Sequence, residues 1–345
     1  LVSTVTPTGA ARVRSLFGDS VTHCYIPFEA PYAVNRFFAA VNPALALVME
    51  TEIWPNLYRG CGVREIPLVL VSARISPKSL SGYRRFLPLF RETLSHGIII
   101  AAQSQSDADR FQQLGANSVR TWVIGNIKFD IELPLGLAEK GQELRESLFP
   151  NRPIWIAAST HDNEEQEVLD AHRRLLESHP DLLLILVPRH PERFKDVAKR
   201  IRQYKFISVK RTEDMPCDPT VEVFLADTMG ELPLFYAASD IAFVGGSLVP
   251  VGGHNMLEPA SLGLPVVSGP QVFNAQEIAD LFVRRGACRM VEDAGQLADV
   301  VEEWVNDAGL ARDVGARGHA IVEDNRGSLA RLLDLLEPLI GSARR

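Results

Sequence analysis

The stretch of this sequence with the most chemical potential runs from Phe243 to Pro270, FVGGSLVPVGGHNMLEPASLGLPVVSGP. Two diglycines, Gly245-Gly246 and Gly252-Gly253, follow a short apolar run, and a helical segment of roughly Asn255–Leu262 comes after them. Glycine lets a ligand approach the backbone closely, and the unpaired N–H groups at a helix start attract phosphate. Glu258 is about one turn into this helix, where a carboxylate suits ribose hydroxyls. We therefore expect a nucleotide site here, in which the diglycine turns ahead of Asn255 present free amide hydrogens to the phosphate; a tight turn with an ordinary surface glutamate is the alternative.

Two charged residues in the first half follow apolar runs that predict strands. Glu50 comes directly after the run Ala44–Met49, and open α/β sheets bind ligands beyond the carboxyl ends of their strands. Its neighbour Glu52 has a structural explanation, because Thr51 is competent to cap a following helix with an acid in its first turn. Lys128 follows the last strand expected in this half, where a cation can neutralise phosphate or developing charge. A solvated surface lysine is the alternative.

Two loops of the second half also follow predicted strands. His161 comes after the run Ile154–Ala158, where we expect it to contact substrate. Arg189 comes after a core strand, where a guanidinium suits a phosphate or a base edge. The alternative for Arg189 is an ion pair with Glu192. The alternative for the first loop is simple helix capping by Ser159, Thr160 and Asp162.

The segment Asp227–Leu234 precedes the diglycine stretch and has two features of interest. Gly230 lets the backbone approach a flat ligand, and Met229 offers an adaptable apolar surface. Thr228 and Glu231 have the spacing of a capping box, which predicts the start of a helix. We expect this capping whether or not the loop also binds a nucleotide.

A basic cluster lies in the first half among leucines and aromatic residues. Its attraction to anionic head groups, or to a phosphorylated lipid acceptor, is worth about 1 kcal/mol for each basic residue near such a surface. The alternative is an ordinary amphipathic helix with a solvated face. The candidates for this contact are Arg74, Lys78, Arg84 and Arg85, with Arg91 nearby.

Short apolar runs alternate with helical patterns along the whole chain, which predicts βαβ units and parallel sheets covered on both faces. The last helical pattern, Ser328–Ile340, has leucines on one face. The apolar runs include Leu68–Val71, Ile154–Ala158, Leu182–Val187 and Ile241–Val244. The pattern breaks at Pro134 and again at Phe149–Pro153. We therefore expect two doubly wound, Rossmann-like domains, whose facing loops form a ligand cleft. The expected boundaries are 1–134 for the first domain, 135–152 for a linker helix, 153–325 for the second domain, and 326–345 for a C-terminal helix that packs back on the first.

Composition narrows the function classes. The chain of 345 residues is 46% hydrophobic and 23% charged, which is typical of globular domains. The formal net charge of −7 argues against general nucleic-acid binding. The four cysteines form no C-x-x-C pair, and the eight histidines show no ligand spacing, so the sequence predicts no metal site. No apolar run approaches the ~18 residues of a membrane span.

Several long motifs resemble those of bacterial 3-deoxy-D-manno-octulosonic acid (Kdo) transferases of lipid A biosynthesis, and the resemblance covers essentially the whole chain. It implies a GT-B glycosyltransferase fold and transfer of Kdo from CMP-Kdo to lipid IVA, the phosphorylated lipid A precursor, in lipopolysaccharide biosynthesis. It also implies no metal or cofactor, and a peripheral place at the cytoplasmic face of the inner membrane. The motifs are Val5–Gly9, METEIWPN (Met49–Asn56), GNIKFD (Gly125–Asp130), ASTHDNEE (Ala158–Glu165), LVPRHPERF (Leu186–Phe194), DTMGEL (Asp227–Leu232) and FVGGSLVPVGGHNMLEPA (Phe243–Ala260).

The resemblance also assigns residues. It implies an acceptor-side first domain and a nucleotide-sugar-binding second domain. Glu50 and Lys128 are implied to stabilise the transition state. His161, Gly252 and Gly253 remain substrate candidates on the strength of their positions alone. The residues implied to bind CMP are Pro188, Arg189, Met229, Gly230, Glu231, Asn255, Met256, Leu257 and Glu258.

One departure from the family is important. Its members have an N-terminal membrane anchor and a Gly-Glu motif that supplies the general base, and neither is found near Leu1. We expect both upstream of this sequence, so that residues 1–345 alone are inactive and the first domain is incomplete. Two other functions stay open: a sugar-nucleotide epimerase of the same fold, and a non-catalytic nucleotide-sugar-binding protein. The number of Kdo units added, the acyl preference and the oligomeric state do not follow from the sequence.

Overall fold

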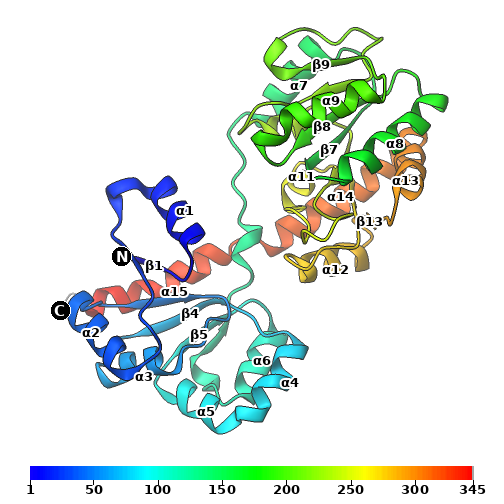
Figure 1. The fold of residues 1–345 in the computed structure, drawn as a ribbon. Helices are drawn as coiled ribbons and strands as arrows, with labels where there is room; N and C mark the ends of the chain where they lie inside the picture. The colour runs from blue at the N-terminus through cyan, green and yellow to red at the C-terminus, as the bar shows by residue number, and fades with distance from the viewer. Residues whose placement is uncertain (344–345) are drawn as a thin grey trace. The chain divides into compact units, whose positions relative to one another are not determined.

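Parallel strands and helices alternate along the chain and group into two units (Figure 1). The structure, a computed structural model, describes residues 1–343. The first unit contains Leu1–Asp130 together with the chain from Arg326 onward, and the second contains Ile131–Asn325. The first boundary therefore falls slightly before the expected position 134.

The first unit has a four-stranded parallel sheet in the order β3-β4-β5-β6 and a separate parallel pair, β1-β2. Short 3₁₀ turns follow several of its elements, including η2 (Arg84–Phe86) and η4 (Ile127–Phe129). Its elements in chain order are β1 (Val2–Thr4), α1 (Pro7–Phe17), β2 (His23–Tyr25), α2 (Pro31–Val41), β3 (Ala46–Met49), α3 (Pro55–Val63), β4 (Leu68–Ala73), α4 (Pro77–Tyr83), α5 (Leu87–Ser95), β5 (Ile99–Ala102), α6 (Gln105–Gln113), β6 (Thr121–Val123) and α15 (Ser328–Ala343).

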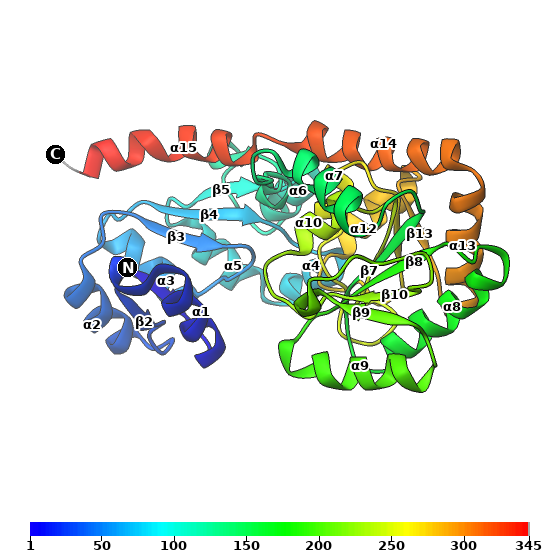
Figure 2. The same ribbon diagram turned by 90° about the horizontal axis from the view of Figure 1, so that it is seen from above.

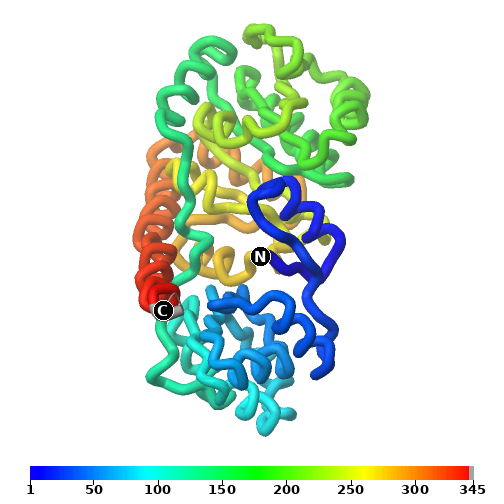
Figure 3. The backbone as a smooth tube through the Cα atoms, turned by 90° about the vertical axis from the view of Figure 1, so that its left-hand side faces the viewer, coloured from blue at the N-terminus to red at the C-terminus, as the bar shows by residue number. Residues whose placement is uncertain are grey.

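The C-terminal helix α15 covers one face of the four-stranded sheet (Figures 2 and 3). Leu332 and Leu336 pack on Val69, on Val71 and on the neighbouring strand β5. The start of the helix is fixed by Asp130, whose carboxylate accepts the amide hydrogens of residues 327 and 329 at 2.6 and 2.7 Å. Helices α2, α3, α5 and α6 cover the other face, so every residue of β4 is buried. That explains why this strand begins with four consecutive apolar residues.

The second unit surrounds a seven-stranded parallel sheet. Its elements in chain order are α7 (Leu137–Leu148), β7 (Ile154–Thr160), α8 (Glu164–Ser178), β8 (Leu183–Pro188), α9 (Phe194–Gln203), β9 (Ser208–Lys210), β10 (Val223–Leu225), α10 (Leu232–Ala237), β11 (Ile241–Val244), α11 (Leu257–Ser261), β12 (Val266–Ser268), α12 (Gln276–Arg284), β13 (Cys288–Met290), α13 (Ala294–Asn306) and α14 (Ala308–Asn325).

The strand order β13-β12-β11-β7-β8-β10-β9 places β7 at the centre of the sheet. From β7 the chain runs outward through β8, and it later returns to the other side at β11, so the direction reverses between β7 and β11. Alternate residues of β7 serve the two faces: Trp155 and Ala157 join one core cluster, and Ile154 and Ile156 join the other. Such a reversal point is where doubly wound folds bind ligands.

The helix expected to act as a linker, α7, lies in the second unit and packs against α10. Arg145 on this helix forms two hydrogen bonds of 2.7 and 2.8 Å with the carboxylate of Asp240. Among residues 1–343, no helix is long and apolar enough to cross a bilayer.

Candidate functional site

Three neighbouring strands deliver the candidate residues of the second unit to one edge of the sheet. His161 follows β7, Arg189 follows β8, and the diglycine loop that leads to His254 follows β11. The amide of Arg189 donates to the carbonyl of Thr160 at 3.0 Å, which joins the first two loops. The strand order thus brings together residues that are far apart in the sequence, at the carboxyl ends beside the reversal point.

The diglycine loop is folded around a carboxylate of the protein itself. Glu164, in the first turn of α8, is fully buried. Its oxygens accept hydrogen bonds from the amides of Gly246 (2.7 Å), Ser247 (2.9 Å) and Leu248 (2.9 Å). A fourth bond of 3.2 Å comes from the amide of His161. The loop is therefore an anion-binding concavity that an internal anion already fills.

The second diglycine is also used internally. The amides of Gly252 and Gly253 donate to the carbonyl of Gly246 at 3.1 and 2.7 Å, and both residues are buried. Our expectation that the diglycines present free amide hydrogens to a phosphate is therefore wrong. The glycines serve close packing instead, because a Cβ on Gly245 would lie 2.7 Å from a Glu164 oxygen.

The segment that follows, Asn255–Glu258, keeps features of a nucleotide site. Helix α11 begins at Leu257, two residues later than predicted, and the Asn255 side-chain oxygen accepts the Leu257 amide at 3.0 Å. Within residues 1–343, the amides of Asn255 and Met256 have no acceptor. Met256 and Leu257 are buried at 1% exposure, backbone included, so Asn255, which is exposed, offers the accessible amide of this segment.

Glu258 and Arg189 bring opposite charges to this place. Burial raises the pKa of Glu258, while a hydrogen bond from the Asn255 amide group (3.2 Å) and the charge of Arg189 oppose that rise. Arg189 is exposed and, in the part of the chain described, forms no ion pair with Glu192. Pro188 before it is buried at the end of β8. A free guanidinium beside a half-buried carboxylate can hold a phosphate and a hydroxyl of one ligand.

The loop before α10 differs from its predicted form. Glu231 is the residue before the helix, but no side chain caps the helix start, so the predicted capping box is wrong. The Glu231 carboxylate instead accepts two hydrogen bonds from Arg211, at 3.2 and 3.0 Å, and one from the Thr228 hydroxyl. Arg211 lies twenty residues earlier in the sequence, in a 3₁₀ turn after β9, and no sequence motif pointed to it. Met229 is left 55% exposed beside Gly230, whose φ is +88°.

His254 and His190, which the sequence analysis did not identify as site residues, contact His161. The Nε2 atoms of His161 and His254 are 2.7 Å apart, and His190 contacts the His161 ring edge-on at 5.3 Å between centroids. Burial lowers the pKa of His254 to about 4, with further lowering from His161 and Arg189. The pKa of His161 is also lowered, first by burial and then by His190 and Arg189. Ser159, Thr160 and Asp162 do not cap α8, because Asn163 precedes it without a side-chain bond.

The first unit brings Glu50 and Lys128 together. The Lys128 ammonium lies 3.0 Å from a Glu50 oxygen, and both side chains are a little under half exposed. Glu50 has a φ of +57°, which is unusual for a residue other than glycine and is often found at functional sites. The predicted Thr51 cap is wrong, because helix α3 begins only at Pro55 and the Thr51 hydroxyl donates to the Arg74 carbonyl.

The basic cluster lies over α4, η2 and the approach to α5. Lys78, Arg84 and Arg85 are exposed, and Arg74 is half-buried. Arg84 donates to the side chain of Gln113 at 2.6 Å. Phe86, at 63% exposure, stands beside the arginines, so the surface combines positive charge with apolar area.

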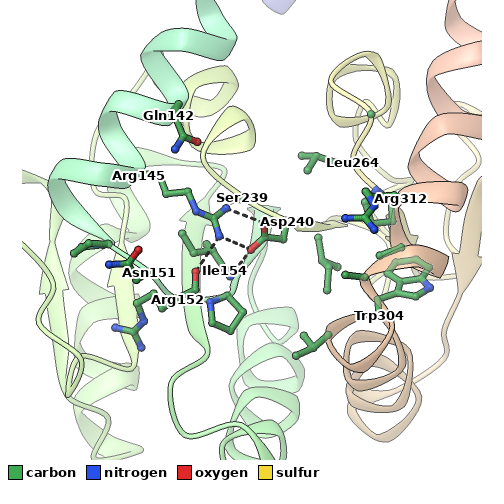
Figure 4. A pocket seen from close by; sticks show the side chains of 18 of the residues that line it. Gln142, Arg145, Asn151, Arg152, Ile154, Ser239, Asp240, Leu264, Trp304 and Arg312 are labelled. Atoms are coloured by element: carbon green, nitrogen blue, oxygen red, sulfur yellow. Dashed lines mark hydrogen bonds and ion pairs between the residues drawn. The ribbon is translucent and has the colours of Figure 1, made fainter.

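One pocket of the second unit lies at the opposite end of the sheet from these loops (Figure 4). It has a volume of about 950 Å³ and is lined where β7, β11 and β12 begin, by Ile154, Ile241 and Pro265, with the Arg145–Asp240 pair on its wall. It therefore contains none of the candidate residues. No group of three His, Cys, Asp or Glu side chains suited to a metal ion occurs among residues 1–343.

Comparisons with known proteins agree with the geometry. Residues 1–131 match the family model for 3-deoxy-D-manno-octulosonic-acid transferase, and residues 151–320 match that for glycosyl transferases group 1. A 3-deoxy-D-manno-octulosonic acid transferase of Haemophilus influenzae is 43% identical over 98% of this chain and 79% of its own length.

Solved structures give the same picture. The C-terminal CMP-Kdo binding domain of WaaA from Acinetobacter baumannii is 37% identical, with a TM-score of 0.53, over 55% of this chain and 98% of that domain. Anabaena Alr3699/HepE in complex with UDP covers 99% of this chain and 91% of its own, with a TM-score of 0.58 and 18% identity. The second likeness concerns the fold alone. The predicted α/β GT-B fold with parallel sheets is confirmed.

Proposed function

The chain belongs to the family of 3-deoxy-D-manno-octulosonic acid (Kdo) transferases, and from that premise we propose that its second unit binds the donor CMP-Kdo. It is a glycosyltransferase that transfers Kdo in lipopolysaccharide biosynthesis. We further propose that the acceptor is a phosphorylated, acylated lipid A precursor. The epimerase and the non-catalytic binding protein are set aside by this family membership.

The observation that carries the donor site is the gathering of Arg189, Asn255 and Glu258 at the reversal point of the sheet. Arg189 supplies a fixed positive charge for the phosphate, and the amide of the exposed Asn255 adds a donor beside it. Glu258 accepts a hydrogen bond from Asn255 on one oxygen and is close enough to Arg189 for the two charges to interact; ribose hydroxyls are suitable partners for such a carboxylate. The amides that sequence analysis assigned to this task, in the diglycines, are not needed.

The reaction breaks the bond between the anomeric carbon of Kdo and a phosphate oxygen of CMP. The electron pair leaves with CMP, an acceptor hydroxyl oxygen forms the new bond, and its proton goes to a base that we assign to no residue of this chain. Positive charge develops on the anomeric carbon, and a carboxylate stabilises such charge. We propose that Glu50 has this role and that Lys128, at 3.0 Å, holds its carboxylate in position.

The basic surface of the first unit is our candidate for contact with the acceptor and the membrane. We propose that Arg84, Arg85 and Lys78 attract the phosphates of the acceptor or of anionic lipids, with the exposed Phe86 adding apolar contact. On this proposal the protein works peripherally at the cytoplasmic face of the inner membrane. The mixed basic and apolar character of this surface supports the proposal.

The test separates binding from chemistry with two variants. In the full-length protein, Glu258→Ala should weaken CMP binding by roughly tenfold, because the hydrogen bond from a ribose hydroxyl to the charged Glu258 carboxylate is lost. Lys128→Met should leave CMP binding unchanged and lower the transfer rate by on the order of a hundredfold. Calorimetry with CMP gives the first quantity, and the mass of the lipid product formed from CMP-Kdo gives the second.

A matched control is Glu277→Ala, which removes an exposed first-turn acid from α12 and should change neither quantity. Unchanged CMP affinity in Glu258→Ala would refute the ribose role. If the wild-type protein turns over CMP-Kdo without extending the lipid, the transferase assignment itself fails.

A further inference from the structure

We propose that His161 and His254 act as one hydrogen-bonded pair that binds an oxyanion of the nucleotide-sugar donor and takes up a proton when it does so. The inference rests on the proposed function, because it deepens the same donor site. The oxyanion is either the phosphate of CMP or the carboxylate of the sugar acid.

The two rings lie edge to edge rather than face to face. Their planes are within 5° of parallel, the centroids are 5.0 Å apart, and the Nε2 atoms are only 2.7 Å apart. A hydrogen bond between two Nε2 atoms needs one N–H and one lone pair, so the rings must adopt opposite tautomers. In the neutral pair, one outer Nδ1 is therefore a donor and the other an acceptor.

Protonation of the pair changes which of the two outer Nδ1 atoms donate hydrogen bonds. One added proton turns the acceptor Nδ1 into a donor while the Nε2 hydrogen bond stays intact. A neutral pair suits a hydroxyl or water at its acceptor Nδ1, whereas the protonated pair is positively charged and offers a donor at that same Nδ1, which suits an oxyanion. Within residues 1–343, neither Nδ1 atom has a protein partner.

The surroundings of the pair are positive and lack a free acid. Arg189, His190 and Arg193 all lower the pKa of His161. The nearby carboxylates are already engaged in the described structure: Glu164 by four backbone amides, Asp162 by Arg193 and Arg200, and Glu258 by Asn255. The burial and the positive neighbours keep the pair neutral until an anion arrives, and the anion then favours the added proton.

The loop architecture holds the pair in place. Glu164 joins the two loops that carry these rings, since its carboxylate accepts the amides of His161 and Gly246. Gly246 lies against both rings: a Cβ there would be 2.8 Å from His254 and 3.4 Å from His161. Gly246 and Glu164 together therefore place the two imidazole rings in one plane beside Arg189.

The experiment measures proton uptake by calorimetry of CMP binding to the full-length protein at pH 7, in two buffers of different ionisation enthalpy. The wild-type protein should take up part of a proton with CMP and none with cytidine, which has no phosphate. His254→Gln and His161→Gln should each abolish the uptake and weaken CMP binding by roughly tenfold while leaving cytidine binding unchanged. His319→Gln, on the exposed surface of α14, is the matched control.

The outcomes separate the sources of the oxyanion. If CMP binding and proton uptake are the same in the variants, but the KM for CMP-Kdo rises and its pH dependence flattens, the pair binds the sugar carboxylate. If neither ligand is affected, the proposal is overturned. Should a variant fail to fold, the wild-type uptake still decides, because zero proton uptake with both CMP and CMP-Kdo contradicts the pair. A wild-type protein that binds no CMP at all would instead defeat the proposed function.

Discussion

Replacing Glu164 by glutamine should cost the second unit more stability than any other single carboxylate-to-amide change on α8. The carboxylate is fully buried and accepts four backbone amides, at 2.7, 2.9, 2.9 and 3.2 Å. A glutamine oxygen can serve two of these donors, but its NH₂ group then faces the others. At about 1–3 kcal/mol for each of the two buried donors left without a partner, the loss is about 2–6 kcal/mol.

The same helix provides a graded control series. Glu167 accepts a single backbone amide, from Ala294 at 3.0 Å, and a glutamine oxygen can replace that acceptor. Glu177 is exposed and has no hydrogen bond in the described structure. Glu167→Gln should therefore cost less than about 1 kcal/mol, and Glu177→Gln close to nothing.

Urea unfolding with circular dichroism measures these free energies, and CMP calorimetry on the folded variants reports the effect on the site. We expect Glu164→Gln to bind CMP more weakly as well, because the loops that carry His161 and His254 lose their common anchor. If Glu164→Gln and Glu167→Gln destabilise the protein equally, within about 0.5 kcal/mol, the internal anion does not organise the loop.

Two further predictions concern acid stability and membrane binding. Burial lowers the pKa of His172 to about 3, so its stabilising effect is complete above the unfolded pKa of about 6.5 and falls by about 1.4 kcal/mol per pH unit below it. Between pH 6.5 and 5 the wild-type protein should thus lose about 2 kcal/mol more than His172→Gln in urea unfolding; parallel profiles would contradict this. Separately, Arg84→Glu with Arg85→Glu should weaken sedimentation with anionic vesicles by at least about tenfold, while the exposed pair Arg284→Glu with Arg285→Glu should not; equal losses would argue against a specific surface.

The elements that sequence analysis predicted best are the strands that are buried on both faces. The runs that became β4, β7, β8 and β11 were each predicted within about two residues, because an uninterrupted apolar run has little alternative in a parallel sheet. The C-terminal helix was expected at Ser328–Ile340 and extends to Ala343. Its leucine stripe is the signal that it packs on a sheet, as Leu332 and Leu336 do.

Capping was predicted poorly, and the reason is physical. Thr51 and Thr228 both have a hydroxyl at a suitable spacing, but helices α3 and α10 begin only at Pro55 and Leu232, too far along the chain for either hydroxyl to cap them. Thr51 donates to a carbonyl of the next strand loop, and Thr228 donates to the Glu231 carboxylate. A capping motif describes only local partners, whereas both residues lie where loops of different strands meet.

The histidine pair could not be predicted because its members are 93 positions apart and meet only through the strand order. The sequence did contain each ring, in STHDNEE and GGHNMLE, but nothing local relates one to the other. The contact between Glu50 and Lys128 likewise could not be predicted from the sequence, although each residue was identified separately. Each was predicted by its position at a strand end, and the fold then placed the two charges 3.0 Å apart.

The diglycine loop of this chain binds an anion through backbone amides, as phosphate-binding loops do, but its anion is a side chain of the protein. Successive backbone amides that converge on one point require a negative charge there, whether a ligand or the protein supplies it. When the protein supplies it, as Glu164 does, the loop is already in place before the donor binds, so binding need not order it. The donor's own charge then has to be met by groups further out. In the described structure these are Arg189, the amide of Asn255, and the imidazole pair that the filled loop supports.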